Sequence, residues 1–292
     1  MRGERKGPRG GKSGSAPEAR PARPPAGGGA ASSSLDKWTS YDQPHWGKKR
    51  PAYRAVIRNY GQGDVEATVT IARPDRKKPG SHKTKSDEPP TLEELAENMK
   101  RAVGRAKTTI RRTIMSANLD HLLTLTYREN TQERDRVWRD FGRFARLVRK
   151  ALPKRTFPFI AVLERQKRGA FHIHAAVAGY QNIPLLRSLW HETIGGSDRG
   201  NIDVQHFGGQ RSRLAKYLAK YISKDLAEAG KGVHRYKRSR GIKMPEEVLL
   251  LPHNLALDTE LIAQFEARGA QVRFHKNRLT QEGAKWLWAC SW

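Results

Sequence analysis

One stretch of the chain limits the possible folds more than any other. Between His121 and Phe207, short apolar runs of strand length alternate with two amphipathic segments of helix length. The expected elements are a strand over 121–128, a helix over 133–151, strands over 157–164 and 171–178, a helix over 185–193 and a strand over 201–207. This β-α-β-β-α-β order predicts an α+β fold of the ferredoxin-like split type, an antiparallel sheet with helices on one face. A final helix is expected over 211–229.

The second and third strands form a hairpin whose register can be predicted. A three-residue hairpin loop commonly ends on a glycine in the left-handed conformation, and Lys167-Arg168-Gly169 fits that form. With this loop, Glu164 lies directly across from His172, and Val162 from His174. Because side chains alternate along a strand, the carboxylate and the two imidazoles then share one face.

This trio of donors has two interpretations. A mixed nitrogen and oxygen site suits Mn²⁺ or Mg²⁺ during turnover, although Zn²⁺ or Ni²⁺ would bind it at least as tightly. The alternative is that the His-x-His pattern arises by chance and that both rings are ordinary residues of a polar face. The carboxylate in register with His172 is the observation that favours a divalent metal site.

The last helix carries a second candidate site. Tyr217 and Tyr221 are four residues apart, which places them one turn apart on the same helix face. An apolar stripe on one flank and a lysine row on the other border the two phenols: Leu214, Leu218 and Ile222, then Lys216, Lys220 and Lys224. Tyrosines at such a boundary are often structural. Alternatively, lysines and a metal stabilise the anion of a phenol, whose ordinary pKa is about 10, and make it a nucleophile.

Three motifs in this order resemble the HUH-class rolling-circle replication initiators of plasmids and bacteriophages. Leu123-Thr124-Leu125-Thr126 is similar to the first, a strand motif. Phe171-His172-Ile173-His174 is similar to the second, the metal-binding motif, with Glu164 in the place of the upstream acidic ligand. The segment from Tyr217 to Lys224 is similar to the third, the nucleophile motif in its two-tyrosine form. The resemblance covers about residues 120–226, under half of the chain, and the ordered set is more specific than any single motif.

The resemblance implies origin-specific nicking and rejoining of single-stranded DNA. A metal on Glu164, His172 and His174 would polarise the scissile phosphate. Tyr221 or Tyr217 would attack it, leaving a 5′-phosphotyrosine and a free 3′-hydroxyl that primes a polymerase.

The same resemblance assigns the lysines and the partners. Lys220 and Lys224 would hold phosphate oxygens, and Tyr221 is slightly favoured as the first nucleophile because Lys224 and Asp225 follow it in the commoner spacing. The implied partners are single-stranded DNA or an origin hairpin, with a host helicase and DNA polymerase. The sequence does not indicate an oligomeric state.

The composition fits a polyanionic partner. Lysine and arginine outnumber aspartate and glutamate by 56 to 29, which gives a formal charge of +27. Basic residues over 139–155 and 231–243 are candidates for a DNA path, although a solvated helix face explains each equally well. The longest apolar run, over 248–251, is too short to span a membrane. The single Cys290 excludes a disulfide scaffold and a cysteine-based zinc module, so a reduced cytoplasmic protein at the nucleoid or a plasmid is expected.

Four regions are predicted along the chain. Residues 1–35 form a disordered basic tail, because they hold almost no large apolar group. Residues 36–90 form an N-terminal extension and linker, with a half-buried strand from Val65 to Ile71. The endonuclease domain spans 91–230 and opens with a capping box, Thr91 and Glu94. Residues 231–292 form a C-terminal extension that packs on this domain.

Three other functions compete with this interpretation. A transposase of the HUH class is expected to carry a cysteine-rich zinc module, and a conjugative relaxase usually has a third histidine where this chain has Ala175 to Gly179. A non-catalytic RNA-binding module shares the topology, but the strand over 171–178 lacks its pair of stacking aromatic residues.

Overall fold

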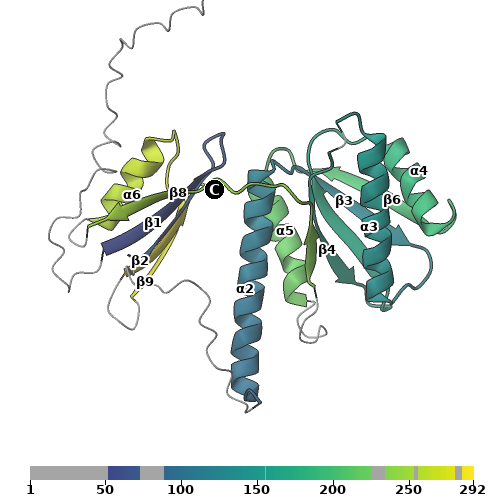
Figure 1. The fold of residues 1–292 in the computed structure, drawn as a ribbon, viewed down its shortest axis with the longest axis horizontal. Coiled ribbons are helices and arrows are strands. Elements are labelled where there is room, and N and C mark those ends of the chain that lie inside the picture. Colours follow the sequence, from purple (N-terminus) through teal and green to yellow (C-terminus); the bar gives the residue numbers. More distant parts are fainter. Residues whose placement is uncertain (1–51, 73–88, 155, 225–233, 253–255, 280–284) are drawn as a thin grey trace, which may run out of the picture. The chain divides into compact units, whose positions relative to one another are not determined.

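The computed structural model describes residues 52–72, 89–154, 156–224, 234–252, 256–279 and 285–292. These residues build two five-stranded antiparallel sheets and five helices (Figure 1). None of the helices in these ranges is long and apolar enough to cross a membrane. The predicted disordered tail, most of the linker and the end of the helix expected to reach residue 229 lie outside the described residues.

The second sheet in the chain contains the predicted domain, in the order β6-β3-β5-β4-β7. Its strands are β3 (His121–Tyr127), β4 (Phe159–Arg165), β5 (Phe171–Val177), β6 (Gly200–His206) and β7 (Tyr236–Arg238). Four of them, β3 to β6, are the strands of the predicted β-α-β-β-α-β unit, and their order across the sheet is fourth, first, third, second. The predicted ferredoxin-like α+β fold is thereby confirmed.

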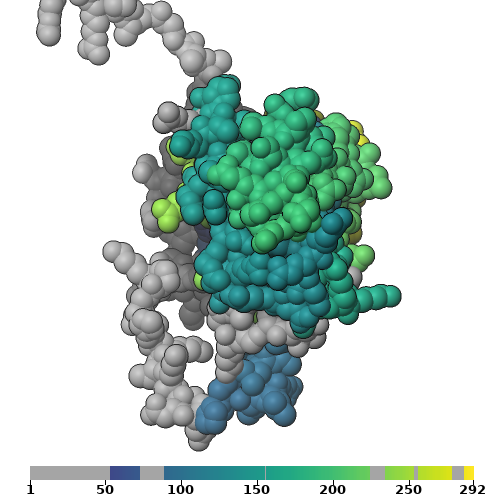
Figure 2. Space-filling model, turned by 90° about the vertical axis from the view of Figure 1, so that its right-hand side faces the viewer, coloured from purple at the N-terminus to yellow at the C-terminus, as the bar shows by residue number. Residues whose placement is uncertain are grey.

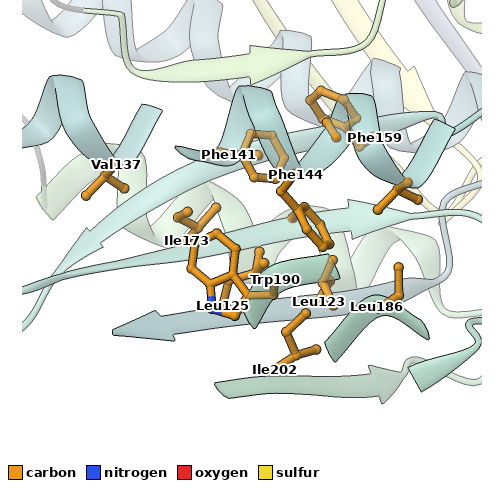
Figure 3. Packing of buried hydrophobic residues seen from close by; sticks show 14 of the residues in the cluster. Leu123, Leu125, Val137, Phe141, Phe144, Phe159, Ile173, Leu186, Trp190 and Ile202 are labelled. Atoms are coloured by element: carbon orange, nitrogen blue, oxygen red, sulfur yellow. The ribbon is translucent and has the colours of Figure 1, made fainter. Parts of the chain in front are cut away.

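The two helices within this unit lie on one face of the sheet, as expected. They are α3 (Arg134–Ala151) and α4 (Ile183–Ile194). Every second residue of β3 points to this face, and Leu123 and Leu125 pack there against Phe141, Phe144 and Trp190 (Figure 3). Figure 2 is turned toward this side, so that the teal and green atoms of the α3–α4 region form the surface seen.

Two further helices cover the opposite face. They are α2 (Leu92–Ser116), which begins with the predicted capping box at Thr91, and α5 (Arg211–Lys224). The core on this side joins Ile110 of α2 and Leu218 of α5 to Ile160 and Ala176 of the sheet. The sheet is therefore buried on both faces, and a side chain of β5 belongs to one face or the other according to its place in the alternation.

The other sheet pairs strands from both ends of the described chain, in the order β8-β1-β2-β10-β9. Its elements are β1 (Ala52–Asn59), β2 (Val65–Ala72), β8 (Glu247–Leu251), β9 (Phe274–Leu279), β10 (Lys285–Cys290) and α6 (Leu257–Glu266). Val65, Val69 and Phe265 lie in its core. The segments treated separately in the sequence, before residue 90 and after residue 231, thus share one sheet and one core.

Glu66 departs from the simple alternation of β2, because its side chain is fully buried. Its Oε1 accepts hydrogen bonds from Nη2 of Arg112 at 2.7 Å and Nη2 of Arg111 at 3.2 Å. Burial by itself would raise the pKa of Glu66, but the two guanidinium groups outweigh burial and lower it. A carboxylate with a lowered pKa stabilises the folded state above its unfolded pKa, and this contribution is lost as the pH falls through the folded value.

Replacing this carboxylate tests the ion pairs. We expect Glu66→Gln to lower the free energy of unfolding by about 2–4 kcal/mol at neutral pH, because two arginines lose their buried partner. The difference from the parent protein should shrink as the pH falls below about 4.5, where the parent carboxyl becomes protonated as well. Urea unfolding at pH 7 and pH 3 measures it. The control is Glu97→Gln in the exposed Glu97–Arg101 pair, which should change stability by less than about 0.5 kcal/mol; equal effects of the two variants would contradict the assignment.

Candidate functional site

The hairpin of β4 and β5 has the predicted register. Glu164 lies across from His172, and Val162 from His174. The loop closes as expected, with the Gly169 amide donating to the Gln166 carbonyl at 2.9 Å and a Gly169 φ of +91°. The loop form therefore places the carboxylate and both imidazoles on the face that α2 and α5 cover.

His174 is held from both sides. Its ring is 4 % exposed, and Nε2 lies 2.7 Å from Oε2 of Glu164. On the other side, Nδ1 lies 3.2 Å from Oγ1 of Thr124, because β3 pairs with β5 so that these two residues are opposite one another. Thr124 thus orients the ring and leaves Nε2 facing the carboxylate.

His172 is more accessible. Its Nδ1 lies 3.2 Å from Nε2 of Gln166 in the hairpin loop. Partial burial lowers the pKa of His172, the nearby His174 and Arg168 lower it further, and the Glu164 carboxylate acts in the opposite direction. The neutral imidazole, which is the form that binds a metal, is therefore favoured.

The two tyrosines of α5 lie against this histidine pair. The ring of Tyr221 stacks on that of His174 with centroids 4.5 Å apart and planes 8° apart. The Tyr217 ring lies edge-on to His174 at 6.1 Å. The Tyr221 hydroxyl donates a hydrogen bond of 2.7 Å to the Tyr217 hydroxyl. The helix and the hairpin, predicted as separate sites, are brought together in one site.

The two phenols differ in exposure. Tyr221 is 5 % exposed, whereas Tyr217 is half-buried. Burial raises the pKa of Tyr221 well above its ordinary value, and the hydrogen bond to Tyr217 and the charge of Glu164 raise it further. The Tyr221 hydroxyl is therefore protonated at neutral pH, and a cation beside Glu164 would act in the opposite direction.

The flanks of α5 divide as the sequence indicates. Leu214, Leu218 and Ile222 are buried in the core. Lys220 is exposed. Lys224 is the last residue of α5, and its side chain lies outside what the structure describes.

The donor set fits a divalent ion in kind, with two imidazoles and one carboxylate on one rigid face. Its present contacts are those of hydrogen-bonded side chains, since Glu164 binds His174 directly. Among the His, Cys, Asp and Glu side chains in the described ranges, one group of three brings its ligand atoms within 4.8 Å of one another, and that group is Asp120, His121 and His206. Metal binding by the hairpin trio therefore requires a small rearrangement that opens the contact between Glu164 and His174.

The remaining candidate residues lie elsewhere. His121 and His206 belong to the α3–α4 face, as their alternation with Leu123 and Val204 shows. His191 of α4 contacts the Gly200 carbonyl at 3.2 Å. The exposed basic side chains proposed for a DNA path are mostly on α3, namely Arg139, Arg143, Arg146, Arg149 and Lys150. That path runs along the face opposite the tyrosines, so it cannot hold the phosphate that the hairpin contacts.

Comparison with known proteins adds an independent observation on the same residues. Residues 120–226 match the family of the replication-associated protein ORF2. The matched segment begins next to β3 and ends just after α5, and it contains the hairpin and both tyrosines.

One curated relative is the Phasyl DNA replicon protein arp of Escherichia coli, which is 26 % identical over 180 residues. That alignment covers 53 % of this chain and 62 % of the relative, so the chain spans about three fifths of that protein. No solved structure matches this chain.

Sequence reasoning assigned no role to Thr124 beyond its place in a strand motif. Its contact with His174 depends on the pairing of β3 with β5, across 50 residues of chain. The pattern that marks it is a polar residue on the same face as the two histidines within an otherwise apolar strand.

The glycine of the loop provides a stability test with a matched control. At Gly169, φ is +91° and an added Cβ would meet the Gln132 side chain at 3.0 Å. We expect Gly169→Ala to lower the free energy of unfolding by about 1–2 kcal/mol, because L-residues with a Cβ disfavour this conformation. The control, Gly104→Ala in the middle of α2, meets no atom within 4 Å and should raise stability by about 0.5–1 kcal/mol. Thermal unfolding of both variants measures the two shifts, and shifts of the same sign would contradict the loop geometry.

Proposed function

We propose that this protein is a replication initiator that nicks and rejoins single-stranded DNA through a tyrosine–DNA intermediate. The observation that carries the proposal is the stacking of Tyr221 on His174, which puts two phenols beside an imidazole pair and a carboxylate. The match of residues 120–226 to a replication-associated family supports the same role.

The residues support a transfer of this kind. A phenolic oxygen attacks the scissile phosphate, the new bond joins tyrosine to phosphorus, and the bond from phosphorus to the 3′-oxygen breaks. The phenolic proton ends on the leaving 3′-oxygen, which is then a free hydroxyl. Because the phosphotyrosine is again a phosphodiester, a 3′-hydroxyl can reverse the step and rejoin the strand.

A divalent ion, Mg²⁺ or Mn²⁺, would be held by His172, His174 and Glu164, and would supply stabilisation of negative charge on the phosphate. Thr124 orients His174 for this purpose. Lys220, exposed on the turn between the two tyrosines, is placed to contact a phosphate oxygen, and we assign Lys224 the same role one turn later.

The exposures of the two phenols favour Tyr217 for the first attack, against the order that motif spacing alone suggested. Its oxygen accepts the hydrogen bond of Tyr221 and is the more accessible of the two. The Tyr221 hydroxyl is buried and must break that bond before it reaches a phosphate. In this proposal Tyr221 acts in a second transfer, with the DNA strand, a host helicase and a polymerase as partners.

Tyrosine variants test the reaction. With Mn²⁺ and labelled single-stranded DNA of the cognate origin, we expect a covalent protein–DNA adduct on a denaturing gel. Tyr217→Phe combined with Tyr221→Phe should abolish the adduct, a loss of at least about 10³-fold, since no nucleophile remains. Tyr217→Phe alone should lower the first-turnover rate more than Tyr221→Phe does.

The controls separate this reaction from simple binding. Tyr180→Phe, an exposed tyrosine away from α5, should leave adduct formation unchanged. Retarded migration on a native gel without any adduct on the denaturing gel would refute the transfer and favour a non-catalytic DNA-binding module.

A threonine pair on β3 tests the metal assignment. Thr124→Val removes the contact to Nδ1 of His174, and we expect about 10–100-fold weaker Mn²⁺ binding. Thr126→Val is the matched control, because Thr126 is on the same strand and its hydroxyl donates instead to the Asn201 carbonyl. Free Mn²⁺ measured by electron paramagnetic resonance reports both, and equal affinities would show that Thr124 does not support a metal ligand.

A further inference from the structure

A second cluster of metal-binding side chains lies on the opposite face of the same sheet. His121 begins β3 and His206 ends β6, and the two residues are direct partners across the strands. Both alternate with residues of the α3–α4 core, whereas Thr124 and His174 face α5. Three residues along a strand also separate His121 from Thr124 by about 10 Å. The cluster is thus separate from the hairpin trio.

The geometry of this cluster is compact. The imidazole rings of His121 and His206 have centroids 4.6 Å apart. Asp120 lies between them, with Oδ1 2.8 Å from Nδ1 of His121 and Oδ2 3.9 Å from Nε2 of His206. One ligand atom from each residue lies within 4.8 Å of the others.

The carboxylate is held in place by the surrounding backbone. Oδ1 of Asp120 accepts a hydrogen bond from the Gly179 amide at 3.0 Å. The Asp120 carbonyl accepts from the amide of Phe207 at 2.9 Å, and its own amide donates to the Val177 carbonyl at 3.1 Å. A ligand fixed in this way loses little conformational entropy when it binds an ion.

We propose that Asp120, His121 and His206 form a second metal site, for Zn²⁺ or a similar borderline transition-metal ion. Two imidazoles and a carboxylate are ligands that Zn²⁺ takes at about 2.0–2.2 Å, which places the ligand atoms about 3.3 Å apart. The atoms need to close by roughly 1 Å, and His206 is free to do so because 56 % of its side chain is exposed. The open side of His206 leaves room for water as the fourth ligand.

The site would fasten an edge strand. β6 is the last strand of its sheet on one side, with β3 as its one neighbour. An ion held by His206 of β6 and by Asp120 and His121 of β3 would link the two strands where the chain leaves the sheet toward α5. The residue after His206 is Phe207, whose ring lies 6.1 Å from that of Tyr217. The ion therefore has a structural role in this proposal, and the site does not depend on the nicking reaction.

Zinc binding by the whole chain tests the site. Metal-free protein is titrated calorimetrically with ZnCl₂, alongside His206→Ala and the control His275→Ala, which removes an exposed histidine from β9. We expect His206→Ala to lose one binding equivalent, or to bind it about 10-fold more weakly or worse, while His275→Ala binds as the parent does. Unchanged stoichiometry and affinity in His206→Ala would overturn the proposal.

A second measurement does not depend on any variant. In crystals of the parent protein soaked with ZnCl₂, anomalous scattering at the zinc edge should give a peak between Asp120, His121 and His206. A peak only at Glu164, His172 and His174 would assign zinc to the hairpin alone and overturn the second site.

Discussion

The register of one hairpin is the constraint on which the candidate site depends. Gly169 adopts a conformation that favours glycine, and this closes the loop so that Glu164 lies opposite His172. Side chains alternate along a strand, so a slip of one residue in the pairing would send the carboxylate to the other face from the histidines. The buried Val162 and Ile160 on β4 resist such a slip, because it would exchange the contents of the two cores.

The sheet separates two sets of polar groups by the same alternation. On the side of α2 and α5 lie the hairpin trio and the phenols, and on the side of α3 and α4 lie His121 and His206. The α3 arginines belong to the second side. DNA that lies along α3 therefore has to pass the edge of the sheet before a phosphate reaches the tyrosines, and the lysines of α5 are the basic groups nearest the reaction.

Local interactions explain how much of the structure follows from the sequence. The hairpin register, the four-residue spacing of the tyrosines and the capping box at Thr91 involve residues close in the chain, and each was predicted correctly. The contact of Thr124 with His174, the side on which His121 lies and the burial of Glu66 depend on pairings over 45 residues or more. Nothing in the local pattern specifies which distant strand or helix supplies the partner.

The stacking of Tyr221 on His174 has a cost as well as a benefit for a nucleophile. The ring contact fixes the phenol close to the metal-binding face, but burial and the hydrogen bond to Tyr217 keep its proton in place. The two hydroxyls share that single bond, so the accepting oxygen of Tyr217 is available while the Tyr221 hydroxyl is held. Once Tyr217 is esterified, its ester oxygen is a weaker acceptor, and the Tyr221 hydroxyl loses part of what retains its proton. The spacing of four residues thus couples the two phenols, so that one transfer prepares the next.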